Sequence, residues 1–345
     1  ADSDITVSGG ALSSFSGSGS FYTATFTPTA DGLTTVDVAS GGFADAAGNT
    51  NTAATQFSWT FNGTPATITG VSLASDNSTI AITLDEPVYN AAGGSGALEA
   101  SDFVFAISGG VATLSSTTPT SISASGNVYT LGIGLSGTPT GGETLTVNPA
   151  SNSIYDAYSN ISTISQSNNT VTVNDKTPPT ITLAVADSDG NSLSSSSTTN
   201  DASLSLTFTT SEATTNFASN DVTLAGGTIS SFSATSSTVY TATFTPSADG
   251  ATTVDVGASV FTDAGGNGNT AAAQYTWTYD GTPSVISSVS LASDNSTIAV
   301  TMNEVVYNTT LGSGAVEMSD FTLSVSGGSA TMASSTPSSI STSGS

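Results

Sequence analysis

The residues best suited to chemistry in this 345-residue chain are acids that recur in a constant order. A Glu comes first, next an Asp that precedes a Phe, Val or Ile, and later an Asp with an Asn four residues on. The members are Glu86, Glu212 and Glu304; Asp4, Asp102, Asp221 and Asp320; and the pairs Asp45 with Asn49, Asp156 with Asn160, and Asp263 with Asn267. Carboxylate and amide oxygens are the ligands that Ca²⁺ prefers. The pattern therefore predicts calcium sites, wherever the fold brings these oxygens together.

Turn formation is the other interpretation of the same acids. Asp and Asn cap tight turns by bonding their own backbone, which needs no metal. For the Asp–Asn element the two interpretations are equally supported. The Glu favours metal, because a carboxylate at the end of an apolar strand is costly without a partner, and this chain has a single basic residue, Lys176. Asp187-Ser-Asp-Gly190 resembles the opening of a helix–loop–helix calcium loop but lacks the later ligands of that motif.

Composition argues against catalysis. The chain contains no His, Cys or Arg, so the usual nucleophile–base pairs cannot be assembled. Carboxylates that repeat along the chain are typical of structural roles, since an enzyme seldom needs the same site in every module. We therefore expect a protein that is not an enzyme.

The formal net charge of −25 limits the partners. Nucleic acids and anionic membranes require basic contacts, so both are excluded. A surface this acidic repels its own kind unless salt or bound cations compensate. No apolar run is long enough to cross a bilayer, so we expect no membrane insertion. The absence of Cys leaves the chain without disulfides.

Long-range self-similarity shows how the acids are organised. Phe26-Thr-Pro recurs as Phe244-Thr-Pro, and the same offset relates Leu73-Ala-Ser-Asp-Asn-Ser-Thr-Ile80 to Leu291–Ile298. The distance along the chain is about twice the length of an immunoglobulin-like sandwich, and we call this period the super-repeat. Thr-Pro pairs at 64–65, 177–178 and 282–283 divide the super-repeat into two unlike units, which we call type one and type two.

These divisions predict four segments. Residues 1–62 form the C-terminal part of a type-one domain, 63–175 a complete type-two domain, 176–280 a complete type-one domain, and 281–345 the N-terminal part of a type-two domain. The first segment lacks a part like 176–217 and the last lacks a part like 128–175. Two explanations follow: a window of a longer chain, which we favour, or copies that complete each other by strand exchange.

Alternation of apolar residues at every second position predicts β-strands throughout. Leu204, Leu206 and Phe208 form one such row, and Ile80, Ile82 and Leu84 form another. Gly pairs and Asp-Gly or Asp-Asn steps separate the rows as turns. We therefore predict an all-β fold of tandem immunoglobulin-like β-sandwich domains, of two alternating types with a 218-residue super-repeat. The aromatic rows around Trp59 and Trp277 fit core strands better than a sugar-stacking platform.

The type-one motifs resemble those of a known family. Phe244-Thr-Pro, Thr253-Val-Asp-Val256, Phe261, Gly266-Asn267 and Trp277 are similar to the bacterial immunoglobulin-like repeats of large surface proteins and adhesins. Glu86-Pro-Val-Tyr89 and Ser101-Asp-Phe103 of the type-two unit resemble a sister repeat. The resemblance implies a secreted, modular, calcium-responsive stalk or fibre that projects or adheres.

Together these features predict a structural segment of an extracellular surface fibre, stalk or filament, stabilised by Ca²⁺, whose partners are neighbouring repeats of the same protein. Two alternatives stay open. One is an adhesin module that binds a surface glycan or a protein. The other is a self-assembling, homopolymeric filament subunit that is completed by strand exchange between neighbours.

Overall fold

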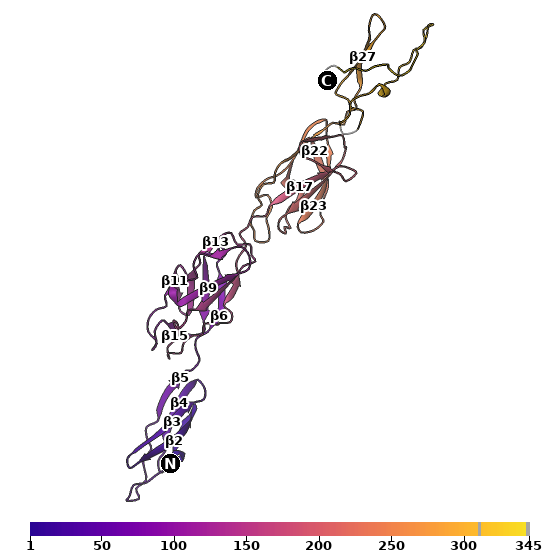
Figure 1. Cartoon of the computed structure of the whole chain (residues 1–345). Coiled ribbons are helices and arrows are strands. Elements are labelled where there is room, and N and C mark those ends of the chain that lie inside the picture. The colour runs from indigo at the N-terminus through magenta and orange to yellow at the C-terminus, as the bar shows by residue number, and fades with distance from the viewer. Residues whose placement is uncertain (310–311, 343–345) are drawn as a thin grey trace. The chain divides into compact units, whose positions relative to one another are not determined.

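The computed structural model describes residues 1–309 and 312–342, and their regular elements are β-strands and three-residue 3₁₀ helices (Figure 1). The predicted all-β class is confirmed. Within these two ranges, no helix has the length and apolar character required to span a bilayer.

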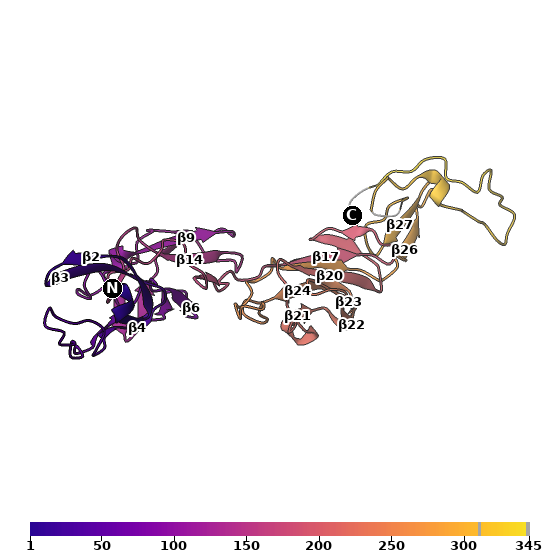
Figure 2. The same cartoon turned by 90° about the horizontal axis from the view of Figure 1, so that it is seen from below.

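The type-one domain that begins after Pro178 is a sandwich of two sheets (Figure 2). One sheet has the order β18-β17-β20-β23-β22, with bounds Ser192–Leu193, Ile181–Ala186, Leu204–Thr210, Val239–Pro246 and Gly227–Ala234. The other has the order β19-β25-β24-β21, with bounds Ser197–Thr199, Tyr275–Tyr279, Gly250–Val256 and Val222–Ala225. The β19–β25 pair is parallel, and the remaining ladders of these two sheets are antiparallel.

The core of this domain consists of the predicted apolar rows. Leu204, Leu206 and Phe208 of β20 face Phe244, Ala242 and Tyr240 of β23, and all six side chains are buried. Trp277 of the opposite sheet is buried and meets Phe244 edge-on at a centroid distance of 4.9 Å. Trp277 is therefore a core residue, and a sugar platform at this position is excluded.

The type-two domain between the first two Thr-Pro pairs has a second, separate core. One sheet has the order β11-β12-β7-β6, with bounds Ile122–Ser125, Val128–Gly132, Thr79–Leu84 and Ile68–Leu73. The facing sheet has the order β16-β14-β9, with bounds Thr170–Thr172, Thr144–Pro149 and Phe103–Ser108. Two short ladders join β10 (Thr113–Leu114) to β13 (Leu135–Ser136) and β15 (Tyr155–Asp156) to β8 (Val88–Tyr89). Ile80, Ile82 and Leu84 are buried in this core, as predicted.

Residues 1–62 reproduce part of the type-one sandwich. β1 (Ile5–Ser8), β4 (Gly32–Val38) and β5 (Phe57–Phe61) form one sheet, and β2 (Gly10–Ser18) pairs with β3 (Phe21–Pro28). These ladders match β21-β24-β25 and β22-β23, including a register shift in β2 after Ser13 and in β22 after Ser230. Phe26 meets Trp59 edge-on at 5.1 Å, as Phe244 meets Trp277. Several large side chains of this segment are exposed, and Phe21, Leu33 and Phe57 are examples.

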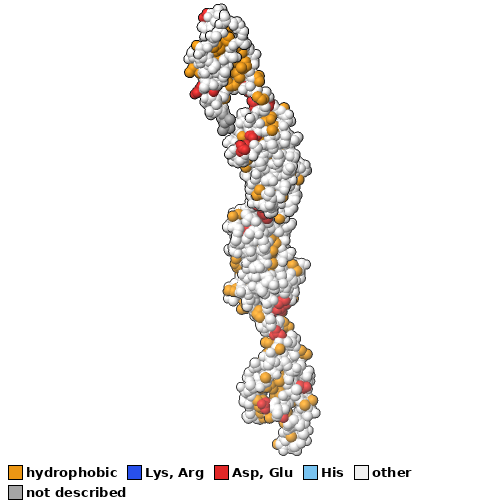
Figure 3. Space-filling view, turned by 90° about the vertical axis from the view of Figure 1, so that its right-hand side faces the viewer, with side chains coloured by type: hydrophobic (Ala, Val, Ile, Leu, Met, Phe, Trp, Pro, Cys, Tyr) orange, Lys and Arg blue, Asp and Glu red, His pale blue; other side chains and the backbone are white. Residues whose placement is uncertain are grey.

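Residues 281–342 reproduce part of the type-two sandwich. β26 (Ile286–Leu291) and β27 (Ile298–Met302) form a hairpin like β6 and β7. Ile298 is 45% exposed, whereas Ile80 at the matching position is fully buried. Hydrophobic side chains accordingly gather at the upper end of Figure 3, on this segment.

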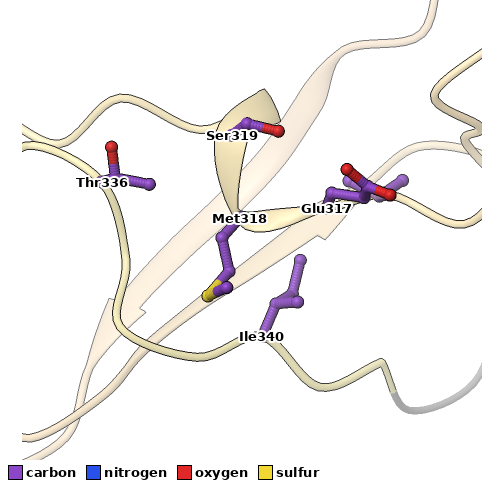
Figure 4. A pocket seen from close by; sticks show the side chains of 6 residues that line it. Glu317, Met318, Ser319, Thr336 and Ile340 are labelled. Carbon is purple, nitrogen blue, oxygen red and sulfur yellow. The ribbon is translucent and has the colours of Figure 1, made fainter.

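A cavity of about 390 Å³ lies in the same C-terminal segment (Figure 4). Its lining includes Val316, Met318 and Ile340. Leu98 and Ile122, which stand one super-repeat before Val316 and Ile340, pack in or against the type-two core. We therefore interpret this cavity as uncovered core surface rather than a ligand pocket.

Glu143 is a buried carboxylate of the type-two domain, and sequence analysis did not single it out. Its Oε1 accepts hydrogen bonds from the backbone N–H groups of Val111 and Ala112, each at 2.9 Å, and its Oε2 accepts one from Thr140 N at 3.0 Å. Burial alone would raise the pKa of Glu143, but the donors of Ala112, Val111 and Thr140 outweigh it and lower the pKa to about 2. The carboxylate thus ties the loop before β10 to the start of β14.

We predict that Glu143→Gln lowers the melting temperature of the type-two domain by roughly 5 to 10 °C, because the amide places a donor against Thr140 N. The pKa of Glu143 is depressed in the folded state, so its stabilisation is present above the usual Glu pKa and is lost as pH falls from 4.5 towards 2. Hydrogen-exchange mass spectrometry of peptides from residues 66–173 measures both effects. Glu99→Gln, an exposed change in the same domain, is the control. Equal melting of the two variants would contradict this role for Glu143.

Candidate metal site

The three predicted Asp–Asn pairs share one hydrogen-bonded turn. In the type-two domain, Asp156 Oδ1 accepts hydrogen bonds from Tyr158 N and Asn160 N, each at 2.8 Å, and Asp156 Oδ2 accepts one from Asn160 Nδ2 at 2.7 Å. Asp45 with Asn49 and Asp263 with Asn267 show the same backbone and side-chain bonds between the two residues. The turn interpretation therefore accounts for the hydrogen bonds within each pair.

Asp187 and Asn191 form a fourth copy of this turn. Asp187 Oδ1 accepts from Asn191 N at 2.7 Å, and its Oδ2 accepts from Asn191 Nδ2 at 3.0 Å. The Asn191 side chain lowers the pKa of Asp187 by this bond, as Asn49 lowers the pKa of Asp45. The resemblance to a calcium loop here comes from a turn motif that the rest of the chain also uses.

Glu86 and the Asp156 turn meet the linker that leads into the type-two domain. Asn160 Nδ2 donates to the backbone oxygen of Asn62 at 2.9 Å, and Asn62 Nδ2 donates to Glu86 Oε2 at 3.4 Å. Glu86 is half-buried and Asp156 is fully buried. Burial raises the pKa of Glu86, and the negative charges of Asp156 and Asp85 raise it further. The structure thus brings Glu86, Asp156 and Asn160 together, and adds Asn62.

The matching positions of the complete type-one domain also carry acids. These acids are Asp175, Glu212 and Asp263. Asp175 stands where the first linker has Asn62, three residues before the Pro of the Thr-Pro pair. Two of these three residues belong to the predicted set, and Asp175 does not.

The Asp of the second predicted element has a different, local role. Each Asp is the last residue of a three-residue 3₁₀ helix, and its carboxylate accepts a hydrogen bond from the residue just before that helix. The helices are η2 (Ala100–Asp102), η3 (Ser219–Asp221) and η4 (Met318–Asp320). Asp102, Asp221 and Asp320 accept from the backbone N–H groups of Glu99, Ala218 and Glu317 at 2.7, 2.8 and 2.7 Å. Asp4 closes η1 (Asp2–Asp4) and accepts from the N-terminal amine of Ala1. Convergence of this second element with the group around Glu86 therefore stays a prediction.

The outer segments hold separate parts of the site. Residues 1–62 contain the Asp45–Asn49 turn, and residues 281–342 contain the half-buried Glu304 together with the linker that precedes it. In sequence, each complete domain therefore carries a Glu, an Asp–Asn pair and a linker residue at matching positions.

A second use of carboxylates, at the linkers, was missed by sequence analysis. Asp31 Oδ1 accepts from Gly63 N at 2.7 Å and its Oδ2 accepts from Thr64 Oγ1 at 2.5 Å. Asp249 makes the same two bonds to Gly281 N and Thr282 Oγ1. Bonding by Thr64 and Gly63 lowers the pKa of Asp31, as bonding by Thr282 and Gly281 lowers that of Asp249. We call these contacts the linker clamps; the signal for them is the shared separation of 32 residues between Asp and Gly.

The linker between the two complete domains is clamped by a backbone oxygen instead. Pro139 O accepts from Lys176 N and from Thr177 Oγ1, each at 2.9 Å. All three Thr-Pro linkers are thus hydrogen-bonded to the domain or segment that precedes them.

Sandwiches joined by short, hydrogen-bonded Thr-Pro linkers define a tandem array of immunoglobulin-like domains. Residues 1–61 and 175–279 match the model of the bacterial Ig-like domain family, which confirms the resemblance seen in the sequence. Residues 43–93 match the model of a repeat associated with flagellar systems. That match begins before the Asp45 turn, crosses the first linker and ends after Glu86.

Two solved structures are similar to the chain at low identity. Invasin, a bacterial integrin-binding protein, has 17% identity and a TM-score of 0.34, with 82% of this chain and 55% of invasin covered. The SGBP-B protein of the Bacteroides ovatus mixed-linkage glucan utilization locus, in complex with a mixed-linkage heptasaccharide, has 16% identity and a TM-score of 0.19, with 77% and 58% covered. The chain therefore spans less than two thirds of either structure. A comparison with curated proteins found no match.

We predict that Glu86→Gln raises the melting temperature of the type-two domain by roughly 2 to 4 °C when a chelator removes metal ions. The pKa of Glu86 is raised in the folded state, so its charge costs stability, and that cost grows as pH rises through this pKa. Neutral Gln removes the cost and keeps the side-chain length. Exchange-detected melting of residues 66–173 at pH 7, beside Glu99→Gln, measures the change. A lower melting temperature for Glu86→Gln would contradict the proposed repulsion.

Proposed function

We propose that this chain is a non-enzymatic structural segment of a bacterial extracellular fibre or stalk, in which Ca²⁺ stabilises the domain poles. The observation that carries the proposal is the first linker, which is hydrogen-bonded on both sides. Asp31 of the preceding segment holds Gly63 and Thr64, and Asn160 of the following domain holds the backbone of Asn62. A linker held in this way transmits orientation between modules, as a stalk requires.

The chemistry of the described residues supports a structural role. The chain has no His, Cys or Arg. Its acids are engaged in turns, 3₁₀ caps and linker clamps, as Asp156, Asp102 and Asp31 illustrate. Groups bonded in this way hold the backbone, whereas catalytic acids and bases must face a substrate.

The residues around Glu86 fit a calcium ion in donor type and in charge. Carboxylates of Glu86 and Asp156 and amide groups of Asn62 and Asn160 are the oxygen-bearing groups that Ca²⁺ uses. The raised pKa of Glu86 arises from burial and from the charge of Asp156, so a cation would relieve an existing cost. A formal net charge of −25 gives the whole chain the same need for cations. Bound Ca²⁺ would supply charge neutralisation and a tie between the linker and the domain.

We expect millimolar Ca²⁺ to raise the melting temperature of residues 66–173 by several degrees relative to chelator, because an ion that binds only the folded state stabilises it. Glu86→Gln should lose most of this gain, and Glu99→Gln should keep it. Mg²⁺ at the same concentration controls for charge screening, since Mg²⁺ dehydrates reluctantly and prefers a tighter octahedral set. An unchanged melting temperature in Ca²⁺ would leave the acids with their turn and capping roles alone.

A second prediction concerns the linker clamp. Asp31→Ala removes both acceptors of Gly63 N and Thr64 Oγ1, so the first linker should become mobile. Small-angle scattering should then give a Kratky profile of modules joined by a flexible linker, while the unmodified chain and Asp37→Ala keep the profile of fixed modules. The unmodified chain should also change to the flexible profile at acid pH. The pKa of Asp31 is depressed, so its hydrogen bonds to the linker are lost when the carboxylate is protonated as pH falls below 3.8. A flexible profile for the unmodified chain at neutral pH with Ca²⁺ would overturn the stalk proposal.

A further inference from the structure

The segment 1–62 presents an open strand edge beside an apolar face. β3 forms a ladder with β2 alone in the described structure, whereas its counterpart β23 lies between β22 and β20. Tyr22 is 54% exposed and Phe43 is 55% exposed. Tyr240 and Phe261, which occupy the same positions one super-repeat later, are 4% and 1% exposed. The two copies thus differ in what covers one face.

The complete copy shows which residues provide this cover. Leu204, Leu206 and Phe208 of β20 lie opposite Phe244, Ala242 and Tyr240. Phe217, farther along the same segment, then packs on Tyr240 at a centroid distance of 5.1 Å and on Phe261 at 5.0 Å. The single stretch 201–217 therefore completes the sheet edge and also covers the aromatic face beyond it.

We propose that β3 and the face formed by Tyr22, Phe26 and Phe43 bind an extended segment with the pattern of residues 201–217. The segment pairs antiparallel with β3 and supplies Leu, Leu and Phe at alternate positions, with a further Phe nine residues after the third. By analogy with β20 on β23, the two Leu side chains lie opposite Phe26 and Ala24, and the first Phe lies opposite Tyr22. Backbone hydrogen bonds provide the affinity of such strand addition, and the alternate side chains provide its specificity.

An unfolded or free segment suits this edge better than a folded second copy. In the described structure β20 already pairs with β17 on one edge and with β23 on the other. A second copy could offer its 201–217 stretch only by opening its own sandwich, which would expose Leu206 and Phe208. The partner we propose is therefore a segment that carries this part of the repeat unpaired. The proposal is independent of calcium binding and of the linker clamps.

The test is titration of the full chain with a synthetic peptide of residues 201–217, followed by calorimetry. We expect one peptide per chain with a Kd of about 10 µM or below. Hydrogen exchange should slow at β3, Tyr22 and Phe43 and stay unchanged in residues 66–173. A peptide with Leu206→Asp should bind at least about tenfold more weakly. A peptide with Ser205→Asp, which places the same charge on the exposed face of the strand, should bind like the original.

Matched variants of the chain locate the site. Ala24→Asp introduces charge at the position opposite the central Leu, and Thr25→Asp introduces it one residue away, on the other face of β3. Both residues are exposed in the free chain, so neither change should unfold the segment. Ala24→Asp should abolish binding and Thr25→Asp should preserve it. Lack of binding by the original peptide, equal binding to both variants, or self-association of the chain that the peptide does not displace would each overturn the proposal.

Discussion

The shortage of basic residues governs how this chain uses its acids. With 26 Asp and Glu residues and one Lys, ion pairing within the chain cannot satisfy the carboxylates. Neutral groups donate hydrogen bonds to the carboxylates instead, and backbone N–H groups are the commonest of these donors in the sites described. Glu143 is held by loop amides, Asp156 by its own turn, Asp102 by the amide of Glu99, and Asp31 by Gly63 and Thr64. Because such bonds favour the charged form, Asp31 and Glu143 have depressed pKa values.

This chemistry also explains why the acids lie at turns, poles and linkers. Amide groups that are not used in a sheet ladder occur at those places, and a carboxylate that binds them fixes the backbone where the sandwich does not. Glu86 departs from this rule, because burial and Asp156 act against its charge and raise its pKa. A cation bound beside Glu86 would offset this cost. The proposed calcium site and the linker clamps are therefore two outcomes of one constraint.

The internal repeat provides a comparison that separates local from long-range effects. The β2–β3 and β22–β23 hairpins have the same ladder and the same register shift, although only the second lies in a complete sandwich. The contact of Phe26 with Trp59 likewise matches that of Phe244 with Trp277. What differs is exposure: Phe43 is open and Phe261 is buried. Hairpin geometry is thus a property of the local sequence, while burial depends on the presence of the second layer.

The sequence by itself determined the strands and the core rows of this protein, and it indicated the Asp–Asn turns as one of two interpretations. Alternation of Leu204, Leu206 and Phe208, and a turn closed by Asp263 and Asn267, depend on residues only a few positions apart, so side-chain type is sufficient to predict them. The tertiary structure decided which acids meet. Asp102 caps a helix that lies beside it in sequence, whereas Glu86 reaches the linker and the Asp156 turn. Side-chain type did not reveal the clamp from Asp31 to Gly63 or the burial of Glu143, because their partners include backbone N–H groups, which every residue except proline carries and which only folding brings near.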